Sequence, residues 1–230
     1  MPSSPKKRII IAIDGGAGSG KSTLARELAK RLSFLYIDTG AMYRAITWKA
    51  IRNKIELTQE KKLQKIAQES HLELKPPKKE GEDIQVFIDG RDVTEEIRSP
   101  LISSHVSDVA KVSGVRECMV AHQRKIAEKE NAILEGRDIG TVVFPNADIK
   151  FFLVADVEKR AARRKQQLAQ HGTEMAVEKI QKNLQQRDEI DSSRKDSPLK
   201  SAEDAILIDT TEQSVEEMVE VALKFIKERL

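Results

Sequence analysis

The sequence predicts an α/β fold of three layers, α/β/α, in which helices cover both faces of a five-stranded parallel sheet. Short apolar runs recur along the chain, and mostly helical, charge-rich stretches separate them. This alternation is typical of parallel sheets, because each crossover between parallel strands is long enough to hold a helix. The composition, 39% hydrophobic and 33% charged, is that of a globular chain. We therefore expect residues 1–230 to form one domain.

Five apolar runs are expected to form the strands of the sheet. They cover residues 8–13, 34–37, 132–134, 149–155 and 205–208. Residues 1–7 are polar and contain prolines, so we expect ordered structure to begin after them. Two of the remaining stretches repeat apolar residues at helical spacing. They are residues 21–32, with Leu24, Leu28 and Leu32, and residues 215–230, with Val219, Leu223 and Ile226.

Two regions interrupt this alternation. Residues 72–98 combine a Pro76-Pro77 turn, the charged loop KKEGED, a strand-like run at 84–89 and a turn at Gly90. They predict a small β-rich insertion that could lie on the substrate side. Residues 158–200 are polar and arginine-rich, and they offer little apolar surface to bury apart from Leu168, Ile180 and Leu184. We expect this segment to be either a mobile lid or a solvated helical hairpin.

The overall charge indicates no class of macromolecular partner. Forty lysines and arginines nearly balance 37 acidic residues, so nothing in the balance requires nucleic acid or an anionic membrane. The apolar run at 9–13 is too short for a signal peptide or a transmembrane helix, which predicts a cytoplasmic protein. We expect a monomer. Cys118 has no second cysteine to pair with and is expected in the core, and the four histidines show no metal-ligand spacing.

A glycine-rich loop lies between the first expected strand and the first expected helix. It reads GGAGSGKST and fits the G-x-x-x-x-G-K-[ST] pattern of a P-loop. The glycines let the backbone N–H groups point at phosphate oxygens, and the helix adds its positive N-terminal end. We expect Lys21 to contact the β- and γ-phosphates of ATP and the Ser22 hydroxyl to bind Mg²⁺. The expected ATP-binding residues of the loop are Gly15, Gly16, Ala17, Gly18, Ser19, Gly20, Lys21, Ser22 and Thr23.

Two classes of P-loop protein find no support in the rest of the chain. A guanine-specific GTPase needs Asn-Lys-x-Asp after a strand, whereas the nearest match, at 53–56, ends in Glu56 and lies in a polar helical stretch. Motor ATPases usually carry an apolar strand that ends in Asp-Glu, and residues 206–209 run into two threonines instead. Kinases of small molecules and ATP-gated binding proteins remain.

Arginines follow two of the expected strands, at the edge where parallel sheets bind ligands. Arg44 lies in DTGAMYR after the second strand, and Arg137 lies in EGRDIGT after the third. Arginine suits phosphate because its guanidinium donates two parallel hydrogen bonds. A third group, in the polar segment, comprises Arg160, Arg163, Arg164, Arg187 and Arg194. So many cations in a segment with so little apolar surface predict a second phosphate-bearing ligand beside ATP.

An acceptor that carries a phosphate would need no general base, because a phosphate is already ionised at neutral pH. The protein would have to align donor and acceptor, screen their repulsion and stabilise charge on the transferring group. A lysine, a magnesium ion and arginines suffice for these tasks. The residues therefore predict a phosphotransferase whose expected catalytic residues are Lys21, Arg137 and Arg187.

Five segments resemble the successive motifs of bacterial cytidylate kinases, in the nucleoside monophosphate kinase family of P-loop kinases. They read DGGAGSGKST, DTGAMYR, VSDVAKVSGVRE, EGRDIGTVVFP and QRDEIDSSR, and the match spans residues 9 to about 209. The resemblance implies that ATP phosphorylates CMP or dCMP. It also implies that the segment at about 70–105 is an inserted CMP-binding subdomain and that about 158–200 is a short helical lid.

The resemblance further implies roles for single residues. Arg44, Arg137 and Arg187 would hold the CMP phosphate, with Asp191 at the ribose hydroxyls. Arg160 and Arg164 resemble lid arginines that fold over the ATP phosphates. Asp138 would accept a hydrogen bond from the exocyclic amine of cytosine, a group that uracil replaces with an oxygen. The implied CMP-binding set is Thr39, Tyr43, Arg44, Ser107, Arg116, Arg137, Asp138, Arg187, Asp191 and Arg194.

The chain departs from the family pattern at two positions. Ser22 stands where the family commonly has glycine, which restores the hydroxyl of the general P-loop. Glu135 stands where aspartate is more usual, so its contacts near the acceptor phosphate are not predicted. Two alternatives stay open, a kinase for another small acceptor such as UMP, another nucleotide or shikimate, and a nucleotide-gated binding protein.

Overall fold

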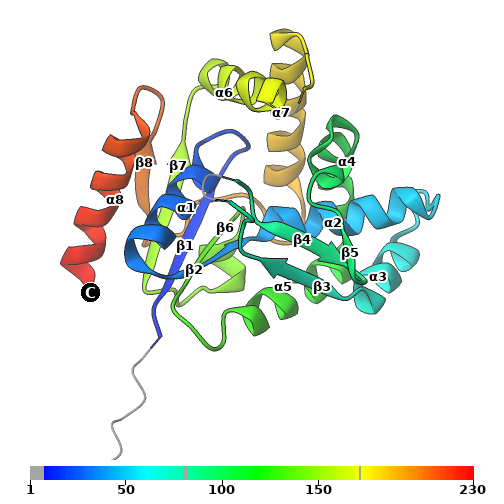
Figure 1. The fold of residues 1–230 in the computed structure, drawn as a ribbon, viewed down its shortest axis with the longest axis horizontal. Helices are drawn as coiled ribbons and strands as arrows, with labels where there is room; N and C mark the ends of the chain where they lie inside the picture. Colours follow the sequence, from blue (N-terminus) through cyan, green and yellow to red (C-terminus); the bar gives the residue numbers. More distant parts are fainter. Residues whose placement is uncertain (1–7, 80–81, 171) are drawn as a thin grey trace, which may run out of the picture.

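The structure, a computed structural model, describes residues 8–79, 82–170 and 172–230 (Figure 1). Its centre is a five-stranded sheet in the order β2-β6-β1-β7-β8, and all of its pairings are parallel. The strands are β1 (Ile10–Gly15), β2 (Leu35–Asp38), β6 (Ala132–Gly136), β7 (Ile149–Val154) and β8 (Ile206–Asp209). The predicted α/β class is confirmed, and every expected apolar run contributes a strand.

The strands β1 and β6 continue beyond their apolar runs. Residues 8–13 and 132–134 were expected to be strands, yet β1 ends at Gly15 and β6 at Gly136. Asp14 is paired with Gly136 on one side and with Phe152 on the other. Pairing along both edges of β1 holds polar and glycine residues extended although they have low strand propensity. The P-loop and the segment with Arg137 therefore begin at the same end of neighbouring strands.

Helices cover both faces of the sheet because alternate residues of β1 point to opposite sides. Ile11 and Ile13 belong to the core beneath α1 (Lys21–Leu32) and α8 (Val215–Arg229). Ile10 and Ala12 belong to the core on the opposite face. The helices of that face are α2 (Thr39–Arg52), α3 (Glu60–Glu69), α4 (Pro100–Ala110) and α5 (Ser113–Ile126).

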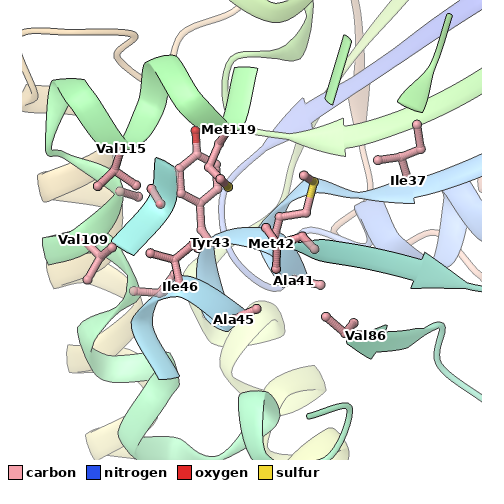
Figure 2. Close-up of a cluster of buried hydrophobic side chains, with 14 of the residues drawn as sticks. Ile37, Ala41, Met42, Tyr43, Ala45, Ile46, Val86, Val109, Val115 and Met119 are labelled. Atoms are coloured by element: carbon pink, nitrogen blue, oxygen red, sulfur yellow. The ribbon is translucent and has the colours of Figure 1, made fainter. Parts of the chain in front are cut away.

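The second core fixes the helix that carries Arg44. Met42 and Tyr43 of α2 pack beside Met119 of α5 and Val109 of α4, all of them buried (Figure 2). Cys118, which was expected in the core, is only partly buried and packs against this cluster from α5. Because α2 is clamped between the sheet and two helices, its first turn is held at the carboxyl end of β2.

The inserted region folds as a small antiparallel sheet, as its β-rich pattern predicts. The sheet has the order β3-β4-β5, with β3 (Leu72–Lys75), β4 (Gln85–Ile88) and β5 (Arg91–Asp92), and it is followed by the 3-10 helix η1 (Glu96–Arg98). Val86, Ile88 and Ile97 are buried in the same core as α2. Because the insertion shares this core, it is attached to the main sheet through apolar packing.

The polar segment forms a helical hairpin of α6 (Val157–Gln170) and α7 (Val177–Ser193) (Figure 1). Its three predicted apolar residues, Leu168, Ile180 and Leu184, are buried together with Ala161 and with Ala17 of the P-loop. This small third core therefore places the hairpin against the P-loop. No helix within residues 8–79, 82–170 and 172–230 is both long and apolar enough to cross a membrane.

Candidate active site

The P-loop curls between β1 and α1, and glycines make two of its bends possible. Gly15 has a φ of 147°, and a Cβ added there would collide with the carbonyl oxygen of Leu153. Gly20 precedes α1 with a φ of 93°, a left-handed conformation that favours glycine. Since Gly20 has no side chain to cap the helix, the first N–H groups of α1 are available to an anion.

Lys21 is buried and folds back over the loop. Its Nζ donates a 2.5 Å hydrogen bond to the Gly16 carbonyl and lies 3.4 Å from Ser19 Oγ. Burial, followed by the charge of Arg137, lowers the pKa of Lys21 to about 7. A bound phosphate would favour the charged form of the lysine. The P-loop is therefore built to place a cation beside an anion.

One cleft of about 1200 Å³ joins the P-loop to the inserted segment and to the α6–α7 hairpin. Most of the predicted site residues line this cleft. Gly15, Gly16, Ser19 and Arg160 do not line it. The predicted residues on its walls are Ala17, Gly18, Gly20, Lys21, Ser22, Thr23, Thr39, Tyr43, Arg44, Ser107, Arg116, Arg137, Asp138, Arg164, Arg187, Asp191 and Arg194.

Four arginines crowd one part of the cleft wall. Burial and the charges of neighbouring arginines, Arg137 first, lower the pKa of Arg187 to about 9. Within the part of the chain that the structure describes, no hydrogen bond or ion pair engages Arg187, and its Nε is buried. Such mutual repulsion is relieved by a bound anion. The four arginines are Arg44, Arg137, Arg164 and Arg187.

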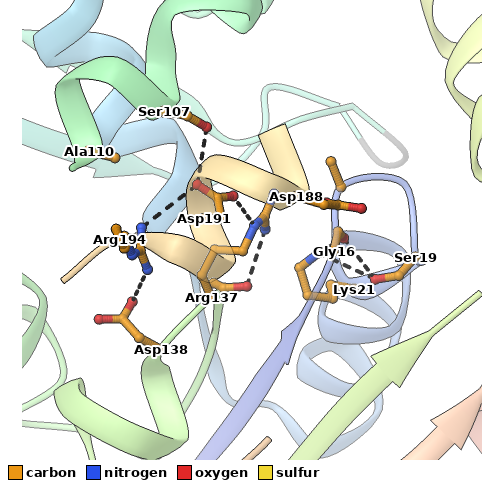
Figure 3. A network of polar contacts seen from close by, with 12 residues as sticks. Gly16, Ser19, Lys21, Ser107, Ala110, Arg137, Asp138, Asp188, Asp191 and Arg194 are labelled. Carbon is orange, nitrogen blue, oxygen red and sulfur yellow. Dashed lines mark hydrogen bonds and ion pairs between the residues drawn. The ribbon is translucent and has the colours of Figure 1, made fainter. Parts of the chain in front are cut away.

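Asp191 ties three elements together beside this cluster (Figure 3). Arg137, just after β6, donates a 2.9 Å hydrogen bond from Nε to Asp191 Oδ2. Ser107 of α4 donates a 3.1 Å hydrogen bond to Asp191 Oδ1. Burial would raise the pKa of Asp191, but the arginine charges, led by Arg137, keep it below the usual value. The carboxylate is therefore held ionised between α7, α4 and the strand-end segment.

A second buried carboxylate, Asp138, lies between two guanidinium groups. Arg116 of α5 donates a hydrogen bond to Asp138 Oδ2, and Arg194 Nη2 lies 3.9 Å from Oδ1. The Arg116 guanidinium also lies 5.4 Å from the ring centroid of Tyr43. All four residues line the cleft. The structure thus brings together four residues of the implied CMP-binding set, among them Asp138, which the resemblance assigned to the base.

Comparison with known proteins identifies the family. The family model for cytidylate kinase matches residues 11–228. The chain belongs to the cytidylate kinase family. A cytidylate kinase of Caldanaerobacter subterraneus subsp. tengcongensis is 53% identical over 210 residues, which is 91% of this chain and 91% of that protein. One from Geobacillus sp. (strain WCH70) is 48% identical over 98% of this chain and 99% of its own length.

A solved structure supports the fold alone. An uncharacterised protein from Eubacterium ventriosum superposes with a TM-score of 0.54 at 16% identity, covering 96% of this chain and 100% of that one. At that identity the similarity shows a shared α/β architecture and carries no information about the reaction.

Asp14 begins the first of the quoted motifs, yet it was not among the predicted site residues, and it is buried at the end of β1. Its Oδ1 accepts a 2.8 Å hydrogen bond from the backbone N–H of Ile139, and its Oδ2 accepts one of 2.7 Å from Gly140. Burial raises the pKa of Asp14 to about 6, although these two hydrogen bonds oppose the shift. Asp14 therefore anchors the π-helical turn η2 (Ile139–Val143), which follows Arg137 and Asp138.

Glu135, where the cytidylate kinase family more often has aspartate, is also buried beside the P-loop. Its Oε1 accepts a 2.6 Å hydrogen bond from the Tyr36 hydroxyl. Burial and the charge of Asp38 raise the pKa of Glu135. The longer side chain is thus accommodated by Tyr36, whose position inside the apolar run 34–37 gave no signal of this contact.

The two predicted lid arginines occupy different places. Arg160 Nη1 donates to Asp188 Oδ2 at 2.5 Å and to the Ala17 carbonyl at 3.2 Å, so it lies against the P-loop. Arg164 Nη2 instead donates a 3.1 Å hydrogen bond to Ser103 Oγ of α4. The resemblance had grouped the two residues, but their guanidiniums, one turn apart on α6, contact different elements. Arg160 borders the donor side, and Arg164 lies with the arginine cluster.

The described residues contain no cluster of histidine or cysteine side chains that could bind a metal ion. There, no group of three or more His, Cys, Asp or Glu residues could hold a metal ion. His71 is exposed, and His105 and His122 are partly buried. His171 lies outside the described residues.

Proposed function

We propose that the protein is an ATP-dependent kinase that phosphorylates CMP or dCMP, giving ADP and CDP or dCDP. One observation carries the proposal: the P-loop and a partly buried arginine cluster share a single cleft, so two phosphate-bearing molecules can lie side by side. Membership in the cytidylate kinase family supports the same reaction. The acceptor arginines are Arg44, Arg137 and Arg187, and the donor loop is centred on Lys21.

The proposed reaction moves one phosphoryl group without a general base. An oxygen of the CMP phosphate forms a bond to the γ-phosphorus of ATP, and the bond from that phosphorus to the β–γ bridging oxygen breaks. Negative charge accumulates on the transferring oxygens and on the leaving ADP. Lys21, Arg137 and Arg187 stabilise this charge, and the buried wall of the cleft strengthens each of these interactions. The Arg137 to Asp191 hydrogen bond orients the guanidinium before substrate binds.

Base selection is proposed to depend on Asp138. A carboxylate accepts a hydrogen bond from the exocyclic amine of cytosine, whereas the corresponding oxygen of uracil would face another acceptor. Arg116, from α5, and Arg194, from the end of α7, hold the carboxylate in position. Ser107 and Asp191, joined by their hydrogen bond, border the same part of the cleft and suit the cytosine and the ribose hydroxyls. Thr39 and Tyr43 complete the lining.

The oxygen donors at the P-loop fit a magnesium ion that enters with ATP. Ser22 is exposed to the cleft in the first turn of α1, and Glu135 lines the same cleft. Hydroxyl and carboxylate oxygens, with phosphate oxygens, are the ligands that Mg²⁺ prefers. When bound, the ion would neutralise charge on the donor phosphates. Ser22 is proposed as the protein ligand, with Glu135 orienting its hydroxyl.

The inserted segment at about 70–105 and the hairpin at about 158–200 are proposed to act as a CMP-binding subdomain and a lid. Residues of both line the cleft, and Arg160 and Asp188 of the hairpin already contact each other over the P-loop. Closure of such segments around bound substrates would exclude water, which could otherwise accept the phosphoryl group.

We further propose a cytoplasmic monomer. The proposed substrates are nucleotides of the cell interior. Large apolar side chains with more than about half their surface exposed are scattered over separate elements of the described chain, as with Leu101 on α4 and Leu207 on β8. A stable dimer would need a contiguous patch.

The proposal is tested by ADP release with saturating ATP and a panel of acceptors. Fast release with CMP and dCMP, and much slower release with UMP, AMP and shikimate, is the expected result. Equal or faster turnover of another acceptor would assign the protein to a different kinase. If no acceptor were phosphorylated while Lys21→Met abolished binding of a protein partner, a nucleotide-gated binding protein would be the better description.

A further inference from the structure

Arg98, in the inserted segment, lines the cleft although no motif had pointed to it. It is the last residue of η1, which packs against α2 and α4. The preceding residue, Ile97, is fully buried in the core. The Arg98 side chain is 12% exposed and lies on the cleft wall with Arg44 and Arg164. The buried Ile97 thus holds η1 in place, and the Arg98 side chain lines the space where the substrates are proposed to bind.

The Arg98 guanidinium is incompletely paired. Its Nε lies 2.9 Å from Asp83 Oδ2, yet Nε and Nη2 are buried and make no hydrogen bond to any described residue. Asp83 also pairs with Arg26 of α1 at 2.9 Å, and 36% of its side chain is exposed. A carboxylate shared with a second arginine and open to solvent neutralises Arg98 only in part. Buried, unpaired guanidinium N–H groups are costly unless a ligand accepts their hydrogen bonds.

Three cations from three separate segments meet at this point. Burial and then the charges of Arg44 and Arg98 lower the pKa of Arg164 to about 10. Asp38 pairs with Arg44 at 2.9 Å, and it is the carboxylate whose pKa both Arg44 and Arg98 lower against burial. The negative charges of Asp38 and Asp83, of which Asp83 is shared with Arg26, do not neutralise the three guanidiniums. α2, the insertion and the α6–α7 hairpin therefore converge on a place that suits a doubly charged anion.

We propose that Arg98 binds the phosphate of the acceptor nucleotide, so that the inserted segment contributes a substrate contact of its own. The inference rests on the proposed function, since it takes a nucleoside monophosphate as the ligand. It adds Arg98 to the predicted phosphate-binding arginines and places Arg164 with them. The competing explanation is structural: Arg98 would only fasten the insertion to α1 through Asp83 and Arg26.

Calorimetric titration with CMP and with cytidine separates the two roles, because only CMP carries the phosphate. Arg98→Ala is expected to weaken CMP binding by about tenfold or more and to leave the affinity for cytidine within about twofold. Asp83→Asn removes the ion pairs of Asp83 with Arg98 and Arg26 but keeps the Arg98 guanidinium, so CMP affinity should stay within about threefold of the wild type. Arg91→Ala, an exposed arginine of the same segment paired with Glu96, serves as the control for general loss of charge.

Two results would overturn the inference: an equal loss of CMP and cytidine affinity in Arg98→Ala, or a loss in Asp83→Asn as large as that in Arg98→Ala. If Arg98→Ala does not fold, Arg98→Lys gives the same comparison, with a smaller but still phosphate-specific loss. A wild-type protein that binds CMP no better than cytidine would overturn the proposed function as well. A wild type that prefers CMP, together with an Arg98→Ala variant that prefers CMP over cytidine by the same factor, would overturn the role of Arg98 alone.

Discussion

Arg137 and Asp191 are joined by a 2.9 Å hydrogen bond, although 54 residues separate them in the sequence. One residue follows β6, which neighbours the central strand β1, and the other lies near the end of α7. The contact brings the sheet edge and the helical hairpin to one place, and both side chains line the substrate cleft (Figure 3). Arg137 is consequently oriented by a buried acid before any phosphate arrives.

Arg137→Ala should slow phosphoryl transfer strongly. Removing a charge clamp that acts on the transition state costs about 3–4 kcal/mol, which corresponds to a fall in kcat/KM of roughly 10² to 10³. Steady-state kinetics with CMP measure the effect. Arg31→Ala is the matched control, because Arg31 pairs with Glu216 and Glu220 on the surface, away from the cleft. A fall of less than about threefold in Arg137→Ala would refute the clamp.

Ser22→Ala should raise the magnesium concentration needed for half-maximal activity by about tenfold, since the variant lacks the hydroxyl ligand. Ser22→Thr keeps a hydroxyl at the same atom and should retain a dependence close to that of the wild type. Activity measured over a magnesium titration at fixed ATP compares the three proteins. Identical magnesium curves for Ser22→Ala and the wild type would remove Ser22 from the metal site.

Asp14 should make stability depend on pH in a defined window. Its pKa is raised from 3.8 to about 6 in the folded protein, so the folded state holds the proton more tightly than the unfolded chain. Its stabilising contribution is complete below about pH 4 and is lost as the pH rises through about 6, by about 3 kcal/mol. The groups that face Asp14 are Asp138, which raises its pKa, and Lys21, which lowers it.

Asp14→Asn cannot titrate, so it isolates this contribution. The wild-type free energy of unfolding minus that of the variant should fall between about pH 4 and pH 7 by the amount given above. Urea denaturation of both proteins at several pH values measures the difference. A difference that is constant, or that grows with pH, would show that Asp14 has no raised pKa in the folded state.

The hairpin is expected to close when both nucleotides bind. Amide hydrogen exchange in α6 and α7 should slow in the presence of CMP and a non-hydrolysable ATP analogue, because Arg160 and Arg187 would then contact phosphates. Amides of α8, which packs on the far side of α1, provide the internal reference. Exchange that is unchanged throughout 157–193 would indicate a static hairpin rather than a lid.

The sequence alone predicted the features that depend on local pattern. The strand-loop-helix order around Lys21, the arginines that follow β2 and β6, and the β-rich insertion are each encoded within one continuous stretch of the chain. The ends of β1 and β6 were placed too early because Asp14 and Gly136 are held extended by neighbouring strands. That pairing is a tertiary effect, and it overrides the low strand propensity of both residues.

The residues that escaped prediction act across long distances in the chain. Asp14 binds backbone groups 125 and 126 positions away, so its sequence neighbours say nothing about its partners. Glu135 and Tyr36 are 99 positions apart, and in the sequence Glu135 was only a departure from the family pattern. Arg98 follows a buried isoleucine in a short 3-10 turn, where a single arginine resembles any surface cation until the cleft is seen.

The most direct test of the account follows the phosphoryl group itself. ATP labelled in the γ-phosphate is mixed with the protein, magnesium and CMP in a single turnover, and the labelled products are separated. We predict that the label appears as the β-phosphate of CDP, at a rate matching ADP formation, and that little appears as inorganic phosphate. Label released as inorganic phosphate at the same rate with and without CMP would contradict the claim that the P-loop and the arginine cluster form one transfer site.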